Sequence, residues 1–304
     1  MTSPSAESVA PDAAAGRSAI PVLTEQEFAL FQGLIYREAG IYLAPAKNFL
    51  LARRLGGRVR ELGLRSFAAY YRYVVKSGDR DERIRMLDRI CTNETRFFRE
   101  PRQFEFLDER LLPQWKEAAQ AGRRPRRARV WSAGCSTGEE PYSLAMVLLH
   151  HLPPSDGWSI EVLASDLSTR VLGRAREAVW PIERADDIPE RHLKRFMLKG
   201  TGSQAGRMAA GPELRSIVRF QRLNLNDEHY PVSGPFDLIL CRNVLIYFDQ
   251  QSKTRVIERL LDYLDPRGHL FVGHAESLSS LTDRVRSVIP TVFTKATERR
   301  EVAP

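Results

Sequence analysis

Cysteine is scarce in this sequence and long apolar runs are missing. The three cysteines, Cys91, Cys135 and Cys241, form no C-x-x-C pair, which argues against a disulfide framework and against a metal site. No apolar segment reaches the roughly 20 residues that a membrane span needs, and residues 1–20 lack the basic start and apolar centre of a signal peptide. These absences predict a reduced, cytoplasmic protein without membrane insertion.

Two common phosphate-binding signatures are also missing from the segment that organises the chain, Arg129–Leu144. Its apolar run Val130–Ala133 is broken by Gly134 and Gly138 before a helical pattern begins. A dinucleotide site needs G-x-G-x-x-G and a P-loop needs Gly-Lys, and neither is present. The segment nevertheless predicts a strand, a glycine turn and a helix N-terminus, so free backbone N–H groups can face a polar ligand.

The same turn matches two further patterns. Thr137 and Glu140 have the spacing of a capping box at the start of the helix. The turn, with Ser136 at its centre, also matches the G-x-S-x-G elbow of α/β-hydrolases, and Asp249 and His274 follow in the required order. However, the preceding residues have a helical pattern where an elbow requires strands, and there is no His-Gly-Gly oxyanion motif. A hydrolase that uses Ser136 is therefore the minor alternative.

A third pattern favours a nucleoside cofactor. The next predicted strand, Ile160–Asp166, ends in Ser-Asp. An acidic residue at the end of such a strand is placed to accept hydrogen bonds from ribose hydroxyls. Asp166 could instead cap the helix that follows, but the glycine turn and the carboxylate together favour a site for S-adenosylmethionine.

The chain before this region divides by composition. Residues 1–21 are rich in Ala, Ser and Pro and predict a disordered tail. A helical domain is predicted over residues 22–92, and Thr24 with Glu27 forms a capping box at its start. Residues 93–128 have the pattern of a connector followed by an arginine-rich linker.

One predicted helix of this domain is unusually basic. Its segment Lys47–Arg65 holds six basic residues and one acidic residue, and Arg53, Arg54 and Arg60 are expected to flank or oppose its apolar stripe. The whole chain has a net charge of +8, which indicates an acidic partner. We therefore expect these three arginines to dock an acidic protein surface.

Residues 129–298 alternate between strand and helix patterns, which predicts an α/β domain with a doubly wound parallel sheet and a ligand at the carboxyl ends of its strands. Glycine-rich turns interrupt this alternation and predict a small antiparallel insertion over about residues 197–223. A last strand, over 288–294, is expected at an antiparallel edge.

Four motifs stand in order along the chain. They are Asn-Glu-Thr-x-Phe-Phe-Arg at 93–99, Ser-Thr-Gly-Glu-Glu-Pro-Tyr-Ser at 136–143, Ala-Ser-Asp at 164–166, and Phe-Asp-x-Ile-x-Cys-Arg-Asn-Val-x-Ile-Tyr-Phe at 236–248. Together they resemble the chemotaxis receptor methyltransferases, the CheR family, over about residues 24–295. The resemblance implies an S-adenosylmethionine-dependent protein-glutamate O-methyltransferase with an all-α N-terminal domain, an α/β domain and an inserted β-subdomain.

The resemblance also implies roles for individual residues. Glu140 is implied at the methionine ammonium of the cofactor, with Glu139 left as an alternative, and Asp166 is implied at the ribose. We expect Arg99 to hold the incoming carboxylate and Tyr247 to hydrogen-bond beside it, unless Tyr247 is only a packing aromatic. The full set of implied contacts for S-adenosylmethionine, or for its product S-adenosyl-L-homocysteine, is Asn93, Thr95, Arg99, Glu140, Asp166, Asn224, Leu225, Cys241 and Arg242.

The implied chemistry suits these residues. A glutamate side chain has a reference pKa near 4.3 and is already a nucleophile at neutral pH, so methyl transfer to it needs positioning instead of a general base or a metal. The implied partner is the cytoplasmic domain of a chemoreceptor, whose C-terminal tail could add a strand to the insertion, and we expect a monomeric enzyme.

Methylation of another protein or of nucleic acid is the other alternative. Amino methyltransferases for nucleic acid carry Asp/Asn-Pro-Pro-Tyr/Phe after the fourth strand, whereas this chain has Cys-Arg-Asn-Val at 241–244. We therefore expect no nucleic-acid partner.

Overall fold

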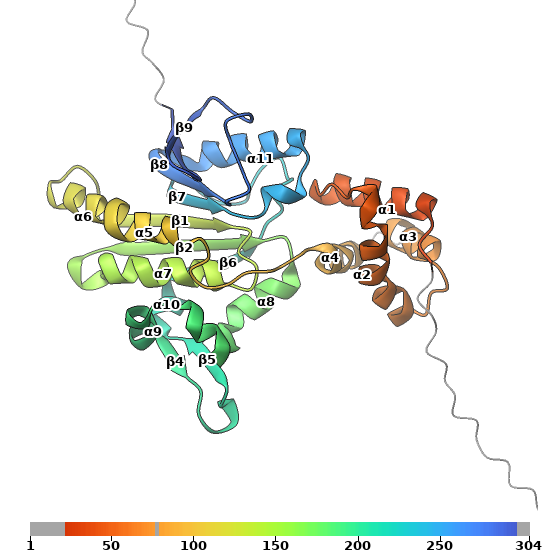
Figure 1. The fold of residues 1–304 in the computed structure, drawn as a ribbon, viewed down its shortest axis with the longest axis horizontal. Helices are drawn as coiled ribbons and strands as arrows, with labels where there is room; N and C mark the ends of the chain where they lie inside the picture. Colours follow the sequence, from red (N-terminus) through yellow and green to blue (C-terminus); the bar gives the residue numbers. More distant parts are fainter. Residues whose placement is uncertain (1–21, 77–78, 297–304) are drawn as a thin grey trace, which may run out of the picture.

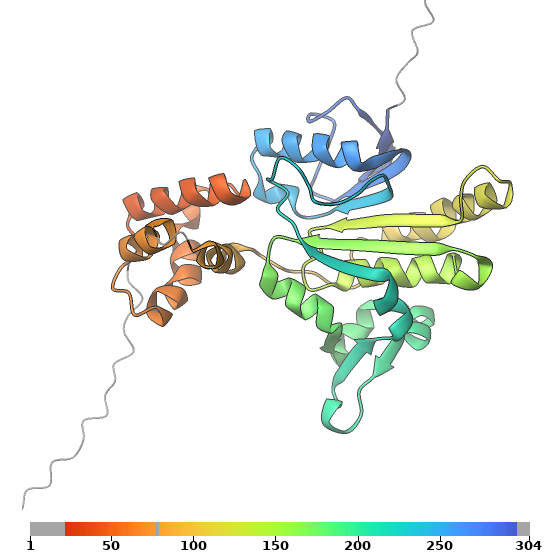
Figure 2. The same cartoon turned by 180° about the vertical axis from the view of Figure 1, so that it is seen from behind.

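The computed structural model describes residues 22–76 and 79–296, which form a helical part and a larger α/β part (Figures 1 and 2). The predicted tail at 1–21 lies outside the described residues, as do residues 297 and 298 at the predicted end of the α/β domain. Across the described ranges, every helix is too short or too polar to cross a membrane. In both views the helical part lies beyond one end of the strands of the large sheet.

The helical part is built from amphipathic helices around a core of its own. The predicted capping box at its start is confirmed, because Thr24 accepts a hydrogen bond from the backbone of Glu27 and the Glu27 carboxylate accepts one from the backbone of Thr24. Phe31, Leu55 and Tyr70 are fully buried where three of the helices meet. The elements are α1 (Glu25–Ala39), η1 (Pro45–Lys47), α2 (Asn48–Glu61), α3 (Phe67–Lys76) and α4 (Arg80–Ile90).

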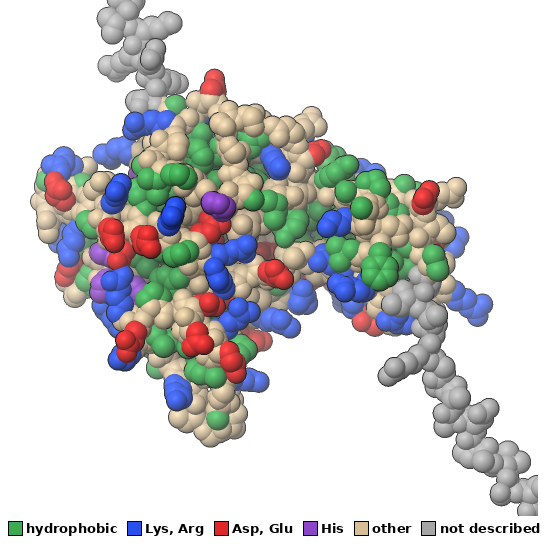
Figure 3. Space-filling view, in the orientation of Figure 1, with side chains coloured by type: hydrophobic (Ala, Val, Ile, Leu, Met, Phe, Trp, Pro, Cys, Tyr) green, Lys and Arg blue, Asp and Glu red, His purple; other side chains and the backbone are tan. Residues whose placement is uncertain are grey.

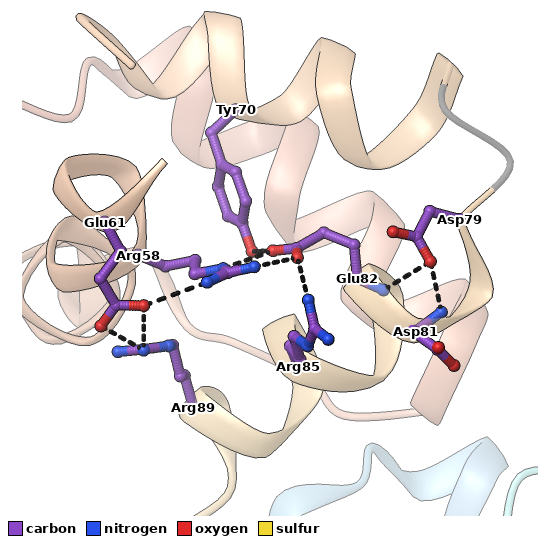
Figure 4. Close-up of polar contacts among 8 residues, drawn as sticks. All are labelled: Arg58, Glu61, Tyr70, Asp79, Asp81, Glu82, Arg85 and Arg89. Atoms are coloured by element: carbon purple, nitrogen blue, oxygen red, sulfur yellow. Dashed lines mark hydrogen bonds and ion pairs between the residues drawn. The ribbon is translucent and has the colours of Figure 1, made fainter. Parts of the chain in front are cut away.

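A buried ion pair joins α2, α3 and α4 (Figure 4). The fully buried carboxylate of Glu82 accepts hydrogen bonds from Nε and Nη2 of Arg58, at 2.9 and 2.6 Å, and from the Tyr70 hydroxyl at 2.9 Å. A buried charge is tolerated when its partner and its hydrogen bonds satisfy it in this way. Arg58 of the basic helix therefore stabilises the domain and is not available to a partner protein.

A predominantly parallel seven-stranded sheet forms the centre of the α/β part, as predicted, with strand order β6-β2-β1-β7-β8-β10-β9. The first five strands in this order pair in parallel, and β10 pairs antiparallel with both β8 and β9. The predicted antiparallel edge is present, but it consists of two strands. The strands are β1 (Arg127–Ala133), β2 (Ser159–Asp166), β6 (Val218–Arg222), β7 (Phe236–Cys241), β8 (Leu264–Val272), β9 (Val285–Ile289) and β10 (Val292–Lys295).

Alternate residues of the central strands pack against opposite layers of helices. Val130 of β1 belongs to the same buried cluster as Leu148 of α7, whereas its neighbour Trp131 belongs to the cluster of Leu260 on α11. Because successive strand residues point to opposite faces, both faces of the sheet are covered, which confirms the doubly wound arrangement. The helices and helical turns in this part of the chain are α5 (Pro101–Phe106), η2 (Leu107–Leu111), α6 (Leu112–Gln120), α7 (Glu139–His151), η3 (Pro154–Asp156), α8 (Thr169–Glu177) and α11 (Gln250–Tyr263).

The small inserted sheet is present, but its predicted boundaries, about 197–223, are wrong at both ends. The sheet has the order β3-β5-β4, and its first strand already begins at Val179. At the other end, Val218–Arg222 is β6, which pairs in parallel with β2 at the edge of the main sheet. The elements of the insertion are β3 (Val179–Pro181), η4 (Ile182–Asp187), α9 (Glu190–Phe196), β4 (Met197–Lys199), η5 (Gly202–Gln204), β5 (Arg207–Ala210) and α10 (Pro212–Ile217).

Candidate active site

The carboxyl ends of β1, β2 and β7 open onto a cavity of about 610 Å³. The helical part supplies its other wall, through the segment after α1 and through Leu50 and Arg54 of α2. The connector at 91–99 crosses between the two walls, and the loop after β7 completes the rim. The cavity therefore lies where the sequence predicts a ligand, but it needs both parts of the chain to form.

The glycine turn after β1 brings the backbone close to this cavity. Gly134 has φ +94°, and a Cβ atom there would lie 2.4 Å from Cγ2 of Val244, so only glycine fits. Its N–H donates to the carbonyl of Ser165 at 2.8 Å, which ties the turn to the end of β2. The predicted capping box at Thr137 and Glu140 is wrong, because the helix starts after Gly138 without a side-chain cap and Thr137 bonds to Glu139 instead.

Asp166 lies at the end of β2 and lines the cavity. Its Oδ2 accepts the backbone N–H of Ser136, and its Oδ1 accepts that of Ser168, both at 2.9 Å. Burial raises the pKa of this carboxyl, while the two backbone donors oppose that rise. The N-cap of α8 is Ser168, so Asp166 is not needed as a helix cap and has lone pairs left to accept ligand hydroxyls.

Glu140, which is partly buried, and the buried Arg242 form an ionic pair in the cavity lining. Glu140 accepts a hydrogen bond from the Ser132 hydroxyl at 2.7 Å, and its Oε2 lies 3.4 Å from Nη1 of Arg242. Burial raises the pKa of Glu140, and the positive charge of Arg242 limits the rise. Glu139 lies outside the cavity lining and accepts the Thr137 hydroxyl at 2.6 Å. Of the two adjacent glutamates, Glu140 is thus the one that can reach a ligand.

Three predicted cofactor residues lie on the connector, and all three line the cavity: Asn93, Thr95 and Arg99. The buried Nδ2 of Asn93 has no hydrogen-bond partner in the described parts of the chain. The carbonyl of Asn93 accepts the Ser136 hydroxyl at 3.0 Å, which joins the connector to the glycine turn. Arg99 donates from one Nη atom to the carbonyl of Glu94 at 3.0 Å and has other N–H groups to offer.

Asn224 and Leu225 also line the cavity, but Cys241 does not. The Asn224 side chain donates to the carbonyl of Glu38 at 2.7 Å, so part of its capacity joins the α/β part to α1. Cys241 is fully buried in the cluster between the sheet and α11, and burial raises its pKa well above the ordinary thiol value. Its side chain is thus a core residue, and only its position before Arg242 relates it to the site.

Tyr247 and a segment of the helical part meet at the rim. The carbonyl of Tyr247 accepts the N–H of Tyr42 at 2.8 Å, and an isolated antiparallel bridge pairs Ile41 with Phe248. This contact was not predicted, because it joins two segments that are distant in the sequence and carry no shared pattern.

Glu100 was also not identified from the sequence as a residue beside the site. Its carboxylate lies 3.9 Å from Nε of Arg242 and accepts the N–H of His274.

The three predicted docking arginines separate into two groups. Arg53 and Arg60 are exposed on α2, where a partner can reach them. Arg54 points the other way and lines the cavity, and its guanidinium donates to the carbonyl of Ile90 and, at 2.7 Å, to the Thr92 hydroxyl. Figure 3 shows Lys and Arg side chains near the junction of the two parts. Arg54 lines the cavity together with Arg96 and Arg99.

The hydrolase alternative finds no support in this geometry. Ser136 donates its hydroxyl to a backbone carbonyl, that of Asn93. Asp249 caps α11 through the N–H of Ser252 and accepts the Tyr36 hydroxyl at 2.8 Å, so its contacts are structural.

The donor set fits S-adenosylmethionine. The cavity is lined by two carboxylates, Asp166 and Glu140, which have the chemistry to accept hydrogen bonds from hydroxyl groups and from an ammonium group. The unpartnered Nδ2 of Asn93 is a buried donor that a ligand carboxylate would satisfy, and a buried donor without a partner costs free energy.

Comparison with known proteins decides the family. A family model described as "CheR methyltransferase, SAM binding domain" matches residues 93–293, and one described as "CheR methyltransferase, all-alpha domain" matches residues 26–91. The chain belongs to the CheR methyltransferase family. It is an S-adenosylmethionine-dependent methyltransferase, as the four motifs predict.

Curated relatives of this CheR methyltransferase match over most of their length. It is 40% identical over 275 residues to "Chemotaxis protein methyltransferase 2" of Pseudomonas aeruginosa, an alignment that covers 90% of this chain and 94% of that one. It is also 40% identical over 272 residues to "Chemotaxis protein methyltransferase" of Escherichia coli, covering 89% and 91%. A protein of the same name from Borreliella burgdorferi is 34% identical over 274 residues, covering 90% and 95%.

Proposed function

We propose that this protein transfers the methyl group of S-adenosylmethionine to glutamate side chains on the cytoplasmic helices of chemoreceptors, as a cytoplasmic monomer. The observation that carries the proposal is the placement of Arg99, Arg96 and Arg54 on the same cavity as Asp166 and Glu140. A cofactor held by two carboxylates and an acceptor that is itself a carboxylate require opposite charges in one site. This cavity supplies both.

S-adenosylmethionine, when bound, would supply a methyl group on a positively charged sulfur. A carboxylate oxygen of the acceptor would bond to the methyl carbon as the carbon–sulfur bond breaks, and S-adenosyl-L-homocysteine would leave. The protein then has three tasks. Asp166 would accept hydrogen bonds from the ribose hydroxyls of the cofactor, Glu140 would accept them from its ammonium group, and Asn93 would donate to its carboxylate. Arg99 holds the acceptor carboxylate in a planar, two-point grip, and Tyr247 donates beside it. No proton needs to be removed, because a glutamate side chain is ionised at neutral pH.

Orientation of the two reactants and exclusion of water provide the remaining rate enhancement. Holding two reactants in line can contribute several kcal/mol of the barrier, on the order of 7–11 in favourable intramolecular cases. The wall from the helical part shields the cavity, through Tyr42 and the bridge between Ile41 and Phe248. This placement supports a role for the helical part in forming the reactive site as well as in binding the substrate.

Two surfaces support docking of a receptor. Arg53 and Arg60 are exposed on α2 and suit an acidic helix. In the inserted sheet, β4 is an edge strand with an exposed Leu198, so an extended receptor tail can pair with it by β-augmentation. The names of the relatives, which refer to chemotaxis, support a receptor as the acceptor.

The proposal is tested by incubating the protein with labelled S-adenosylmethionine and the purified cytoplasmic domain of a chemoreceptor. We expect label in the receptor band and no transfer when the methylated glutamates of the receptor are replaced by alanine. Asp166→Asn serves as the protein control, because it removes a cofactor contact without changing the docking surfaces. Label that appears in nucleic acid, or in a receptor without those glutamates, would contradict the proposal.

A further inference from the structure

A buried carboxylate outside the four motifs holds the loop that carries Arg242 and Tyr247. Glu276 is 7% exposed and lies in the turn that follows β8. Its Oε2 accepts the backbone N–H of Asn243 at 3.1 Å and that of Gly273 at 2.5 Å. Its Oε1 accepts the backbone N–H of Ile246 at 3.3 Å. The Glu276 side chain thus accepts hydrogen bonds from backbone N–H groups of two separate loops.

The loop held in this way has an unusual backbone. Asn243 has φ +57°, in the left-handed region that costs energy for a residue other than glycine. A short 3₁₀ turn, η6 (Leu245–Tyr247), follows directly. A carboxylate that accepts the N–H groups of Asn243 and Ile246 supports this conformation, because it supplies the acceptor for two backbone donors of the loop.

The approach of the two loops depends on Gly273. A Cβ atom at this position would lie 2.7 Å from the side-chain nitrogen of Asn243 and 2.7 Å from Oε2 of Glu276. The adjacent His274 donates its N–H to Glu100, which itself lies beside Arg242. The turn after β8 therefore contacts both the loop after β7, which forms part of the cavity rim, and Glu100, which directly follows the connector.

We propose that Glu276 is a positioning residue for methyl transfer, which acts by fixing the backbone between Arg242 and Tyr247 so that both side chains face the cavity. It does not line the cavity itself. The inference rests on the proposed function only where turnover is measured. Its structural measurement requires neither a receptor nor a cofactor.

The first test is amide hydrogen exchange on the unliganded protein. Glu276→Gln keeps the size of the side chain but replaces one of its two oxygen atoms by an amide nitrogen. Only one oxygen then remains to accept the backbone N–H groups that the two oxygens of Glu276 accept in the wild type. We expect exchange in the segment 242–248 to accelerate roughly tenfold or more, as for the loss of a hydrogen bond to a charged group. Asp237→Asn is the matched control, because Asp237 accepts the N–H of Arg129 at 2.8 Å near the other end of β7.

The second test separates positioning from general stability. We expect Glu276→Gln to bind S-adenosyl-L-homocysteine several-fold more weakly and to lose roughly tenfold or more in turnover at saturating substrates, with Asp237→Asn within about twofold of wild type. If Glu276 acts through Tyr247, then Glu276→Gln combined with Tyr247→Phe loses no more turnover than Glu276→Gln alone. Glu276→Asp, which keeps the charge, replaces Glu276→Gln if the latter does not fold.

The outcomes distinguish the two proposals. If wild-type protein methylates no receptor, the proposed function fails, and the exchange and binding measurements still decide the role of Glu276. Unchanged exchange over 242–248 together with unchanged binding would overturn the positioning role. Equal losses in Glu276→Gln and Asp237→Asn, or strictly additive losses with Tyr247→Phe, would also overturn it.

Discussion

Replacing Asp166 by asparagine changes one atom of the cofactor cavity and tests its assigned role. Each oxygen of Asp166 accepts one backbone N–H at 2.9 Å, from Ser136 and from Ser168. An asparagine can accept from only one of them, and its amide nitrogen then faces the other N–H group. The substitution therefore removes the charge that we propose attracts the ribose hydroxyls, and it weakens the support of the glycine turn.

The size of the effect follows from these contacts. A hydrogen bond to a charged group contributes about 1.5–3 kcal/mol. Loss of one such bond to the cofactor weakens binding roughly 10- to 150-fold. Calorimetry with S-adenosyl-L-homocysteine measures this directly, and Asp237→Asn is the control at the opposite end of the sheet.

The pH dependence gives an independent check on the same residue. Burial raises the pKa of Asp166 above the reference value of about 3.9, so protonation begins at a higher pH than for an exposed aspartate. A protonated carboxyl is a poorer acceptor, and the affinity of the wild-type protein should therefore fall as the pH is lowered from about 7. Asp166→Asn should lack this component. Equal affinities of Asp166→Asn and wild type at neutral pH would refute the ribose assignment.

Four further perturbations test other regions of the molecule. Gly134→Ala should abolish cofactor binding measured by calorimetry, because its Cβ would lie 2.4 Å from Val244; a normal affinity would contradict the tight turn after β1. Arg99→Ala should reduce turnover more than cofactor affinity, and Arg99→Lys should restore turnover only partly; equal losses would make Arg99 only a cofactor ligand. Charge reversal of Arg53 and Arg60 to Glu should weaken receptor binding, most visibly below about 0.15 M salt, with Arg219→Glu as an exposed control. Glu82→Ala should lower the free energy of unfolding in urea by about 3 kcal/mol, because Arg58 would lose its buried partner.

Much of the site could be predicted because its residues follow strands or sit in dense local motifs. Asp166 ends a strand, and the glycine turn comes directly after another, so a parallel sheet brings both to one edge. The connector motif at 93–99 carried no geometric information by itself. Its place on the cavity was implied only by the resemblance to the family.

The errors have physical causes. At the glycine turn, the spacing of Thr137 and Glu140 predicts a capping box, but Glu140 pairs with Arg242, a distant residue that the local sequence does not reveal. The boundaries of the insertion were wrong for two reasons. β3 has only three residues, and the sequence pattern of β6 is compatible with the last strand of a hairpin, whereas β6 pairs in parallel with β2. Short strands are defined by the strands they pair with, and those strands are distant in the sequence.

Side-chain direction was the other source of error. Arg54 follows Arg53 directly on α2, yet one faces the cavity and the other faces solvent. Helical periodicity separates the two directions but does not say what packs on each side. The bridge between Ile41 and Phe248 and the contact of Glu276 with Asn243 likewise join segments that no single motif spans.

The chemical nature of the product tests the central claim most directly. Receptor labelled by this protein should lose its label to dilute alkali as methanol, because the methyl group of a glutamyl ester is hydrolysed there. Mass spectrometry of the same receptor before alkali should place each added methyl group on a glutamate. Label that survives alkali, or a methyl group on lysine, arginine or a nucleobase, would contradict carboxylate methylation.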